Sequence, residues 1–322
     1  MRLHPAGPAA TLAALCAVAV AACGEAPPPA DTESAAVTAA PADARPDTGR
    51  VYERALVFLG SEPDSVFVVP WLLEVRTGGP TTERHARGWL LRGDVWDPFL
   101  ETRWETPPLR APWRPLPHGA LRLQVGDGGG LEGLSFVEDT RRLDLSLGPA
   151  RAEWTGRRGE TFRFLDGSLT LAERSLPGLV LDLNRAVEIQ EGAPGDWMVL
   201  ASGDSLHAVV HTPLREAEDR PGAWRGWVRA DFRDVPTADL TLDWAAVRAF
   251  EAARRDVPVG WTLRSADGTV EGRLEARSFH LVAGEDAGPL LPVDGFFDVE
   301  GTLVFEGAEY AVRGLLRHTQ GD

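Results

Sequence analysis

Lysine is absent from this chain of 322 residues, and cysteine occurs only twice. Without lysine the chain has no phosphate-loop lysine, no Schiff-base lysine and no Ser-x-x-Lys acylation pair. Both cysteines, Cys16 and Cys23, lie near the N-terminus. The remaining sequence therefore has no thiol for a disulfide, a thiolate metal site or a cysteine nucleophile.

Positive charge is also scarce, since 33 basic residues stand against 48 acidic ones and the net charge is −15. A nucleic acid partner is excluded on this basis, because binding nucleic acid requires a positive face. We interpret the acidity as that of a solvated, non-associating surface. No apolar run after Cys23 approaches the roughly 20 residues of a membrane-spanning helix.

The N-terminal segment is typical of a secretory signal, because residues 9–22 are almost all small and apolar. Residues 20–23, "VAAC", resemble a bacterial lipobox, which implies a signal peptide over 1–22 and a diacylglycerol on Cys23. Two or more acyl chains anchor a protein stably, at about 0.8 kcal/mol per buried methylene. Gly24 follows the cysteine, and the sorting of such lipoproteins then implies the outer membrane of the cell envelope. An ordinary secretory signal with an incidental cysteine is the alternative.

Residues 23–49 predict a disordered tether behind the lipidated cysteine. They contain mostly proline, alanine, threonine and acids, with almost no large apolar side chain. Such a composition cannot bury enough surface to offset the entropy of ordering. A loose coil of this length reaches roughly 25–30 Å, which would hold the body away from the bilayer.

From Val51 onward the sequence predicts strands. Apolar and polar residues alternate in segments such as 142–148, "RLDLSLG", as expected for strands with one buried face. The Asp-Gly pairs at 166–167 and 267–268, and Gly307, predict tight hairpin turns. Strands recur too closely for intervening helices, so we expect an all-β fold of antiparallel meander sheets in barrel-like or sandwich-like units.

One short helix is expected near residues 243–256, where Trp244, Val247 and Phe250 have helical spacing and Asp243 can act as N-cap.

The loop at 188–196 is the best dividing point of the body. We expect a first β unit over 50–190 and a second over 191–322, with one large barrel as the alternative.

Gly203-Asp204-Ser205-Leu206 matches the serine block of the GDSL esterases. That resemblance implies a nucleophilic Ser205 and a C-terminal histidine preceded by an aspartate. However, Leu315 stands where the aspartate before His318 would be. Glycine and aspartate also suit a turn between two short strands. We adopt the turn and assign no catalytic residue.

Histidine spacing gives no case for a metal. His207 and His211, if they lie on one strand, are roughly 13 Å apart on the same face and cannot share an ion. The other histidines beyond the signal show no ligand spacing; they are His85, His118, His280 and His318. We therefore expect neither a metal nor a cofactor.

Tryptophan is unusually frequent, with 11 residues against two tyrosines. Indole faces can line a pocket, while indole N–H groups and arginines orient the ligand. A barrel of about eight strands can close around one small molecule. We therefore favour a non-catalytic binding protein for an apolar or amphipathic ligand, with core packing as the alternative role of these indoles. The candidate ligand-binding residues are Trp89, Trp96, Trp104, Trp113, Trp224 and Trp227.

Two other functions remain open. A hydrolase or hydratase, acting on a carbohydrate or lipid-like substrate, would use carboxylates from one acidic stretch. Those carboxylates are Asp94, Asp97, Glu101 and Glu105. A structural lipoprotein would act through protein partners, whose identity the sequence does not give, and would expose an apolar patch.

The arrangement over 50–322 resembles that of the tandem lipocalin-like proteins, the carotenoid hydratase and AttH group. The shared features are an all-β chain, tryptophan-rich early strands and a second half interrupted by a helix. Residues 69–75, "VPWLLEV", stand where that group has a Trp-Trp-Tyr signature. The resemblance implies lipocalin-like β units, and it assigns no catalytic residue.

Overall fold

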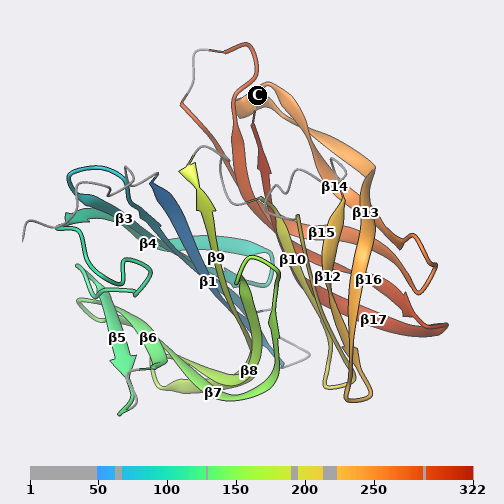
Figure 1. Cartoon of the computed structure of the whole chain (residues 1–322), viewed down its shortest axis with the longest axis horizontal. Coiled ribbons are helices and arrows are strands. Elements are labelled where there is room, and N and C mark those ends of the chain that lie inside the picture. The colour runs from blue at the N-terminus through green and yellow to red at the C-terminus, as the bar shows by residue number, and fades with distance from the viewer. Residues whose placement is uncertain are drawn as a thin grey trace, which may run out of the picture. The chain divides into compact units, whose positions relative to one another are not determined.

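The computed structural model describes residues 49–61, 67–127, 130–189, 195–212, 223–285 and 288–321. These residues form two antiparallel β-sheets (Figure 1). Within the same ranges, no helix is long and apolar enough to cross a bilayer. The expected signal peptide, the lipidation site Cys23 and most of the tether lie outside the described residues.

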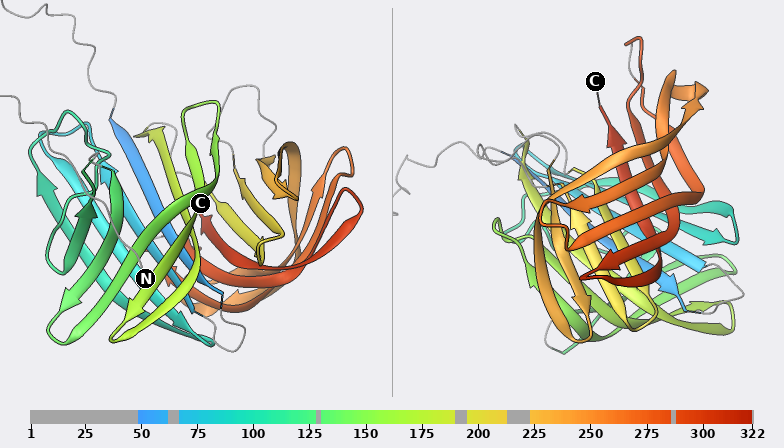
Figure 2. Two further views of the ribbon diagram at one scale, coloured as in Figure 1. Left: turned by 90° about the horizontal axis from the view of Figure 1, so that it is seen from below. Right: turned by 90° about the vertical axis from the view of Figure 1, so that its right-hand side faces the viewer.

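The first sheet has nine strands in the order β4-β3-β2-β1-β9-β8-β7-β6-β5. Its two hairpin-connected halves are joined by the long antiparallel pairing of β1 with β9. Figure 2 shows that this sheet is strongly curved. Its strands are β1 (Arg50–Gly60), β2 (Phe67–Arg76), β3 (Thr82–Arg92), β4 (Val95–Thr106), β5 (Leu121–Val125), β6 (Leu131–Glu138), β7 (Arg141–Thr155), β8 (Thr161–Leu171) and β9 (Arg174–Glu188).

The second sheet is a closed barrel of consecutive strands, completed by the pairing of β10 with β17. Its strands are β10 (Trp197–Ser202), β11 (Leu206–His211), β12 (Trp224–Ala230), β13 (Arg233–Phe250), β14 (Arg255–Ser265), β15 (Val270–Ala283), β16 (Val293–Phe305) and β17 (Ala308–Gln320). The expected all-β class with barrel-like units is confirmed.

Alternation of side chains gives each sheet two apolar faces. In β1, Leu56 and Phe58 belong to a core made only by the nine-stranded sheet. Ala55 and Val57 point the other way, into a core that also contains residues of β10, β11, β16 and β17. The barrel has a third core of its own. The two sheets therefore pack together through a shared apolar seam, and each also fills its own interior.

The predicted turns are confirmed at two places and wrong at a third. Asp267-Gly268 lies between β14 and β15, and Gly307, with φ of 84°, lies between β16 and β17. Asp166-Gly167 instead lies inside β8, paired with β9. The chain reverses further on, at Ala172, which adopts a φ of 52° without being a glycine. A non-glycine residue with positive φ gives little turn signal in a sequence.

The helix predicted near 243–256 is wrong. Residues up to Phe250 continue β13 opposite β14, and only Glu251–Ala253 forms a short 3₁₀ turn. The register of β13 shifts at Trp244/Ala246 and again at Ala246/Val247. Such bulges interrupt the period of two, so a strand can imitate helical spacing. Most of this stretch is exposed, and no buried helical stripe exists.

Candidate functional site

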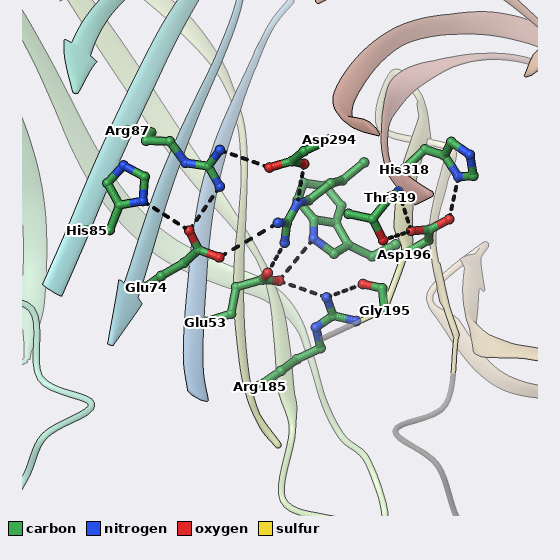
Figure 3. Close-up of polar contacts among 12 residues, drawn as sticks. Glu53, Glu74, His85, Arg87, Arg185, Gly195, Asp196, Asp294, His318 and Thr319 are labelled. Carbon is green, nitrogen blue, oxygen red and sulfur yellow. Dashed lines mark hydrogen bonds and ion pairs between the residues drawn. The ribbon is translucent and has the colours of Figure 1, made fainter. Parts of the chain in front are cut away.

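Charged side chains interrupt the apolar seam between the two sheets (Figure 3). Strands β1, β2, β3 and β9 supply four of them, and β16 and β17 of the barrel supply two. We call this set the inter-sheet charge cluster. Its members are Glu53, Glu74, Arg87, Arg185, Asp294 and Arg317.

Glu53 is the deepest member of the cluster. One carboxylate oxygen accepts hydrogen bonds from Arg185 at 2.8 Å and from the Trp197 indole at 3.2 Å. The other oxygen accepts one from Arg317. Arg185 also donates to the Gly195 carbonyl at 2.6 Å. Glu53 therefore binds groups from β9, β10 and β17 at once, and it ties the nine-stranded sheet to the barrel.

Glu74 and Asp294 extend the cluster toward solvent. Arg87 lies between them and donates to each carboxylate at 2.9 Å. Burial alone would raise the pKa of Glu74, but a hydrogen bond with His85 and the charges of Arg317 and Arg87 lower it to about 2. Burial likewise opposes ionisation of Asp294, yet the same two arginines lower its pKa. Both groups are carboxylates at neutral pH.

His85 lies at the outer end of the cluster, between two carboxylates. Its Nδ1 is 3.6 Å from Glu74, and its Nε2 is 2.7 Å from Glu101 on β4. Each ring nitrogen faces one of the two carboxylates, so His85 can donate a hydrogen bond to either of them.

Glu74 and His85 open onto a cleft of about 520 Å³ on the nine-stranded sheet. This volume is in the usual range for a small-molecule site of roughly 300–1,000 Å³. Buried Arg84 supports the wall by donating to the carbonyls of Pro112 and Arg114. Arg76 is exposed and has no ion pair in the described part of the chain. The lining residues are Val51, Glu74, Val75, Arg76, Glu83, Arg84, His85, Arg103, Trp104 and Glu105.

No protein-family model matches this sequence, and a search of curated proteins finds no match. Two solved structures are similar. Kievitone hydratase from Nectria haematococca has a TM-score of 0.50 and 15% identity, over 83% of this chain and 87% of that chain. A protein assigned as AttH from Nitrosomonas europaea has a TM-score of 0.53 and 10% identity, over 84% and 92%.

This chain shares their fold. The likeness confirms the expected resemblance to AttH proteins at the level of architecture, and at such low identity it carries no residue assignment.

Trp104 is the one predicted tryptophan among the residues that line this cleft. Its ring stacks on His118 with centroids 4.6 Å apart and planes nearly parallel. That stacking fixes the indole as part of the cleft wall.

Trp89 and Trp96 meet at the seam, next to the charge cluster. Their ring centroids lie 5.0 and 6.5 Å from Phe296, and both rings contact His280. The Trp96 indole donates to Ser278 Oγ at 3.1 Å. Burial lowers the pKa of His280, which is therefore neutral here at pH 7.

The other three predicted tryptophans lie elsewhere. Trp113 is 54% exposed, Trp224 belongs to the barrel core, and Trp227 stacks on Trp154 across the seam with centroids 5.9 Å apart. The six indoles therefore do not gather in one pocket.

The four carboxylates that sequence analysis selected do not lie in one place. Glu101 contacts His85 and Glu105 lines the cleft, so two of the four carboxylates reach the candidate site. Asp97 instead pairs with Arg141. Asp94 is exposed on the β3–β4 turn.

The turn at Ser202–Ser205 is confirmed. It connects β10 and β11, and the Ser205 hydroxyl donates to the Ser202 carbonyl at 2.7 Å. His207 and His211 lie on β11, as expected, and pack against Phe164 and Phe162. Their pKa values fall because burial disfavours the charged imidazole. No metal cluster is found among the described residues.

Sequence analysis missed the charge cluster itself. Glu53 and Arg317 are 264 positions apart, so no spacing rule connects them. The available signal was the charged residue inside an apolar strand, such as Glu74 within "VPWLLEV". That signal identifies an unusual position without identifying its partner.

Proposed function

We propose that this protein binds an amphipathic small molecule in the cleft lined by Trp104 and His85. The observation that carries the proposal is the composition of the cleft. It combines an indole face, valine side chains, an arginine that pairs with no carboxylate of the described residues, and a histidine held by carboxylates. An apolar ring or chain could lie on Trp104, while a polar or anionic group is bound by Arg76.

Anchoring of the protein to the outer membrane through Cys23 is part of the same proposal. It is supported by the lipobox-like residues 20–23 and the tether that follows. A lipid-anchored binding protein would meet amphipathic molecules at the membrane surface, where they concentrate.

Binding is tested with 8-anilinonaphthalene-1-sulfonate, an aromatic anion whose fluorescence rises in an apolar site. Trp104→Leu and Arg76→Gln should each weaken its binding several-fold, because they remove the ring face and the cation. Trp113→Leu is the matched control, since this indole is exposed and outside the cleft. Organic extraction of the natively purified protein, followed by mass spectrometry, would identify a natural ligand. Unchanged probe affinity in both cleft variants would reject the proposal.

Acid–base hydration of a carbon–carbon double bond is the second candidate. It is favoured by one observation, the imidazole of His85 between Glu74 and Glu101. In such a reaction a base removes a proton from water as its oxygen attacks one carbon, and an acid delivers a proton to the other carbon. With a pKa of about 2, Glu74 cannot be that acid at neutral pH. We assign the proton transfer to His85, whose imidazole lies between Glu74 and Glu101. Kievitone hydratase supports this candidate as a hydratase of the same fold.

Hydration is tested by incubating the protein with alkenyl phenols in ¹⁸O-labelled water and following incorporation by mass spectrometry. His85→Gln should abolish product without loss of folding, whereas His207→Gln, a change in the seam outside the cleft, should not. Label incorporation that is equal in wild type and His85→Gln would exclude this role.

A further inference from the structure

A separate cavity of about 440 Å³ lies between the β7–β8 turn of the nine-stranded sheet and strands β11, β12 and β13 of the barrel. It shares no lining residue with the cleft of the proposed function. Its volume falls within the roughly 300–1,000 Å³ that is usual for small-molecule sites. The cavity is therefore large enough for a one-ring ligand, and the side chains that line it determine which ligand fits.

One part of the lining is aromatic and carries no charge. The half-buried Trp227 indole and the buried His211 imidazole are nearly parallel, with centroids 5.9 Å apart and planes at 16°. His211 Nδ1 donates to the Thr212 carbonyl at 3.0 Å. Burial and the charges of Arg185 and Arg225 lower the pKa of His211 to about 3, so the ring is neutral at pH 7. These two rings suit an apolar or aromatic group.

Charged residues make the rest of the lining positive. Three arginines line the cavity against two carboxylates; they are Arg157, Arg158 and Arg225, and Glu160 and Asp239. Three positive charges less two negative ones leave one positive charge, in a chain whose net charge is −15. Arginine binds carboxylates through charge-assisted hydrogen bonds, and one negative charge would neutralise this lining. A dianion such as a phosphate ester would leave an excess negative charge, so the lining favours a monocarboxylate.

A buried hydroxyl completes the lining. Thr237 is 7% exposed and lines the cavity, yet its Oγ1 is buried without a hydrogen-bond partner among the described residues. Valine has nearly the same shape and would avoid the cost of burying an unpaired hydroxyl. A carboxylate in the cavity would give this hydroxyl the acceptor that the fold itself does not provide.

The cationic and aromatic groups lie next to each other. Arg225 and Trp227 are two positions apart on β12, so their side chains face the same side of the sheet. Arg225 stands opposite His211 in the pairing of β11 with β12. A molecule with a carboxylate directly on a ring can therefore reach Arg225 while its ring contacts Trp227 and His211.

We propose that this cavity is a second binding site, which takes an aromatic monocarboxylate. The carboxylate binds Arg225 and the Thr237 hydroxyl, and the ring lies against Trp227 and His211. The site is independent of the cleft of the proposed function, and each can be tested without the other.

Benzoate and benzamide test the proposal, because both have a ring and a planar carbonyl group but only benzoate is charged. Calorimetric titration of wild type at pH 7.5 should give roughly tenfold or higher affinity for benzoate, as expected when a charged acceptor replaces a neutral one. Phenyl phosphate, which is largely a dianion at this pH, should bind more weakly than benzoate. In ¹H–¹⁵N spectra, benzoate should shift the indole N–H signal of Trp227 with the same affinity.

Thr237→Val separates a ligand-binding hydroxyl from a structural one. It should weaken benzoate binding roughly tenfold, because the carboxylate loses one hydrogen bond. The midpoint of urea unfolding should stay the same or rise, since the hydroxyl has no partner among the described residues. Arg225→Gln should remove most of the preference for benzoate over benzamide. Thr241→Val is the matched control, because Thr241 lies on the same strand but is exposed and outside the cavity.

Equal affinities of wild type for benzoate and benzamide would overturn the proposal. Tighter binding of phenyl phosphate than of benzoate, or a benzoate affinity that Thr237→Val leaves unchanged, would do the same. A benzoate-induced shift confined to the Trp104 indole would place the probe in the cleft and would also reject this site.

Discussion

Replacing Glu74 by glutamine tests the electrostatics of the charge cluster directly. The pKa of Glu74 falls from its ordinary value of 4.5 to about 2, because Arg87, Arg317 and His85 together outweigh the effect of burial. Each pKa unit corresponds to about 1.4 kcal/mol, so ionised Glu74 contributes about 3 kcal/mol to folding stability at neutral pH. Glu74→Gln should lose that amount at pH 7.

The dependence on pH gives a sharper test than the loss itself. A group with a lowered pKa stabilises the fold above its unfolded value and loses that effect as pH falls toward its folded value. The deficit of Glu74→Gln should therefore shrink below pH 4.5, to less than half by about pH 3.

Urea unfolding of wild type and variant between pH 7 and pH 3 measures this difference. Glu83→Gln is the control, since Glu83 lines the same cleft but is exposed. The stability of the Glu83→Gln protein should differ from that of wild type by no more than about 0.5 kcal/mol. Parallel stability curves for wild type and Glu74→Gln, with a constant gap at every pH, would refute the reasoning.

Three further changes have defined outcomes. Glu53→Gln should be destabilising by about 3–5 kcal/mol in urea unfolding, because it leaves Arg185 and Arg317 buried without a counter-charge; a loss below 1 kcal/mol would contradict this. Burial lowers the pKa of His211 to about 3, so the wild-type protein loses stability as pH falls below 6.5. Between pH 7 and pH 4, the free energy of unfolding of His211→Phe should fall by about 3 kcal/mol less than that of wild type. Ser205→Ala should lower stability by at most about 1 kcal/mol and leave p-nitrophenyl acetate hydrolysis unchanged, since this hydroxyl donates to the Ser202 carbonyl within the turn.

The all-β class could be predicted because each strand carries its own evidence in a period of two. Prediction failed where a bulge or a turn-like sequence interrupted that alternation. Bulges in β13 gave residues 243–250 a helical spacing, and only the pairing with β14 shows that they are a strand. Asp166-Gly167 has the composition of a turn, but its pairing with β9 holds it in β8. In both cases a neighbouring strand overrode a short-range preference.

The candidate site was only partly predictable, for a different reason. Trp104, Glu101 and Glu105 were selected by residue type, and all three lie at or next to the cleft. The partner of His318 was sought three residues before it, where Leu315 stands. The structure supplies Asp196 instead, 122 positions away. Tertiary pairings of this kind depend on which strands become neighbours, and no spacing in the chain encodes them.

Burial within the charge cluster separates its structural members from those that a ligand can reach. The side chains of Glu53 and Arg185 are fully buried, and that of Arg317 is 5% exposed. Each binds several partners across the seam, so a ligand would have to break those bonds to reach them.

Toward the cleft the exposed fraction rises, to 23% for the Glu74 side chain and 17% for that of His85. Glu74 is held ionised by arginines on both sides. A ligand in the cleft would therefore meet the negative charge of Glu74 and, beside it, the imidazole of His85. The proposed hydration assigns proton transfer to His85, because Glu74 stays ionised at neutral pH. A protein that only binds its ligand would use the same pair as a hydrogen-bonding edge, so the response to His85→Gln separates the two functions.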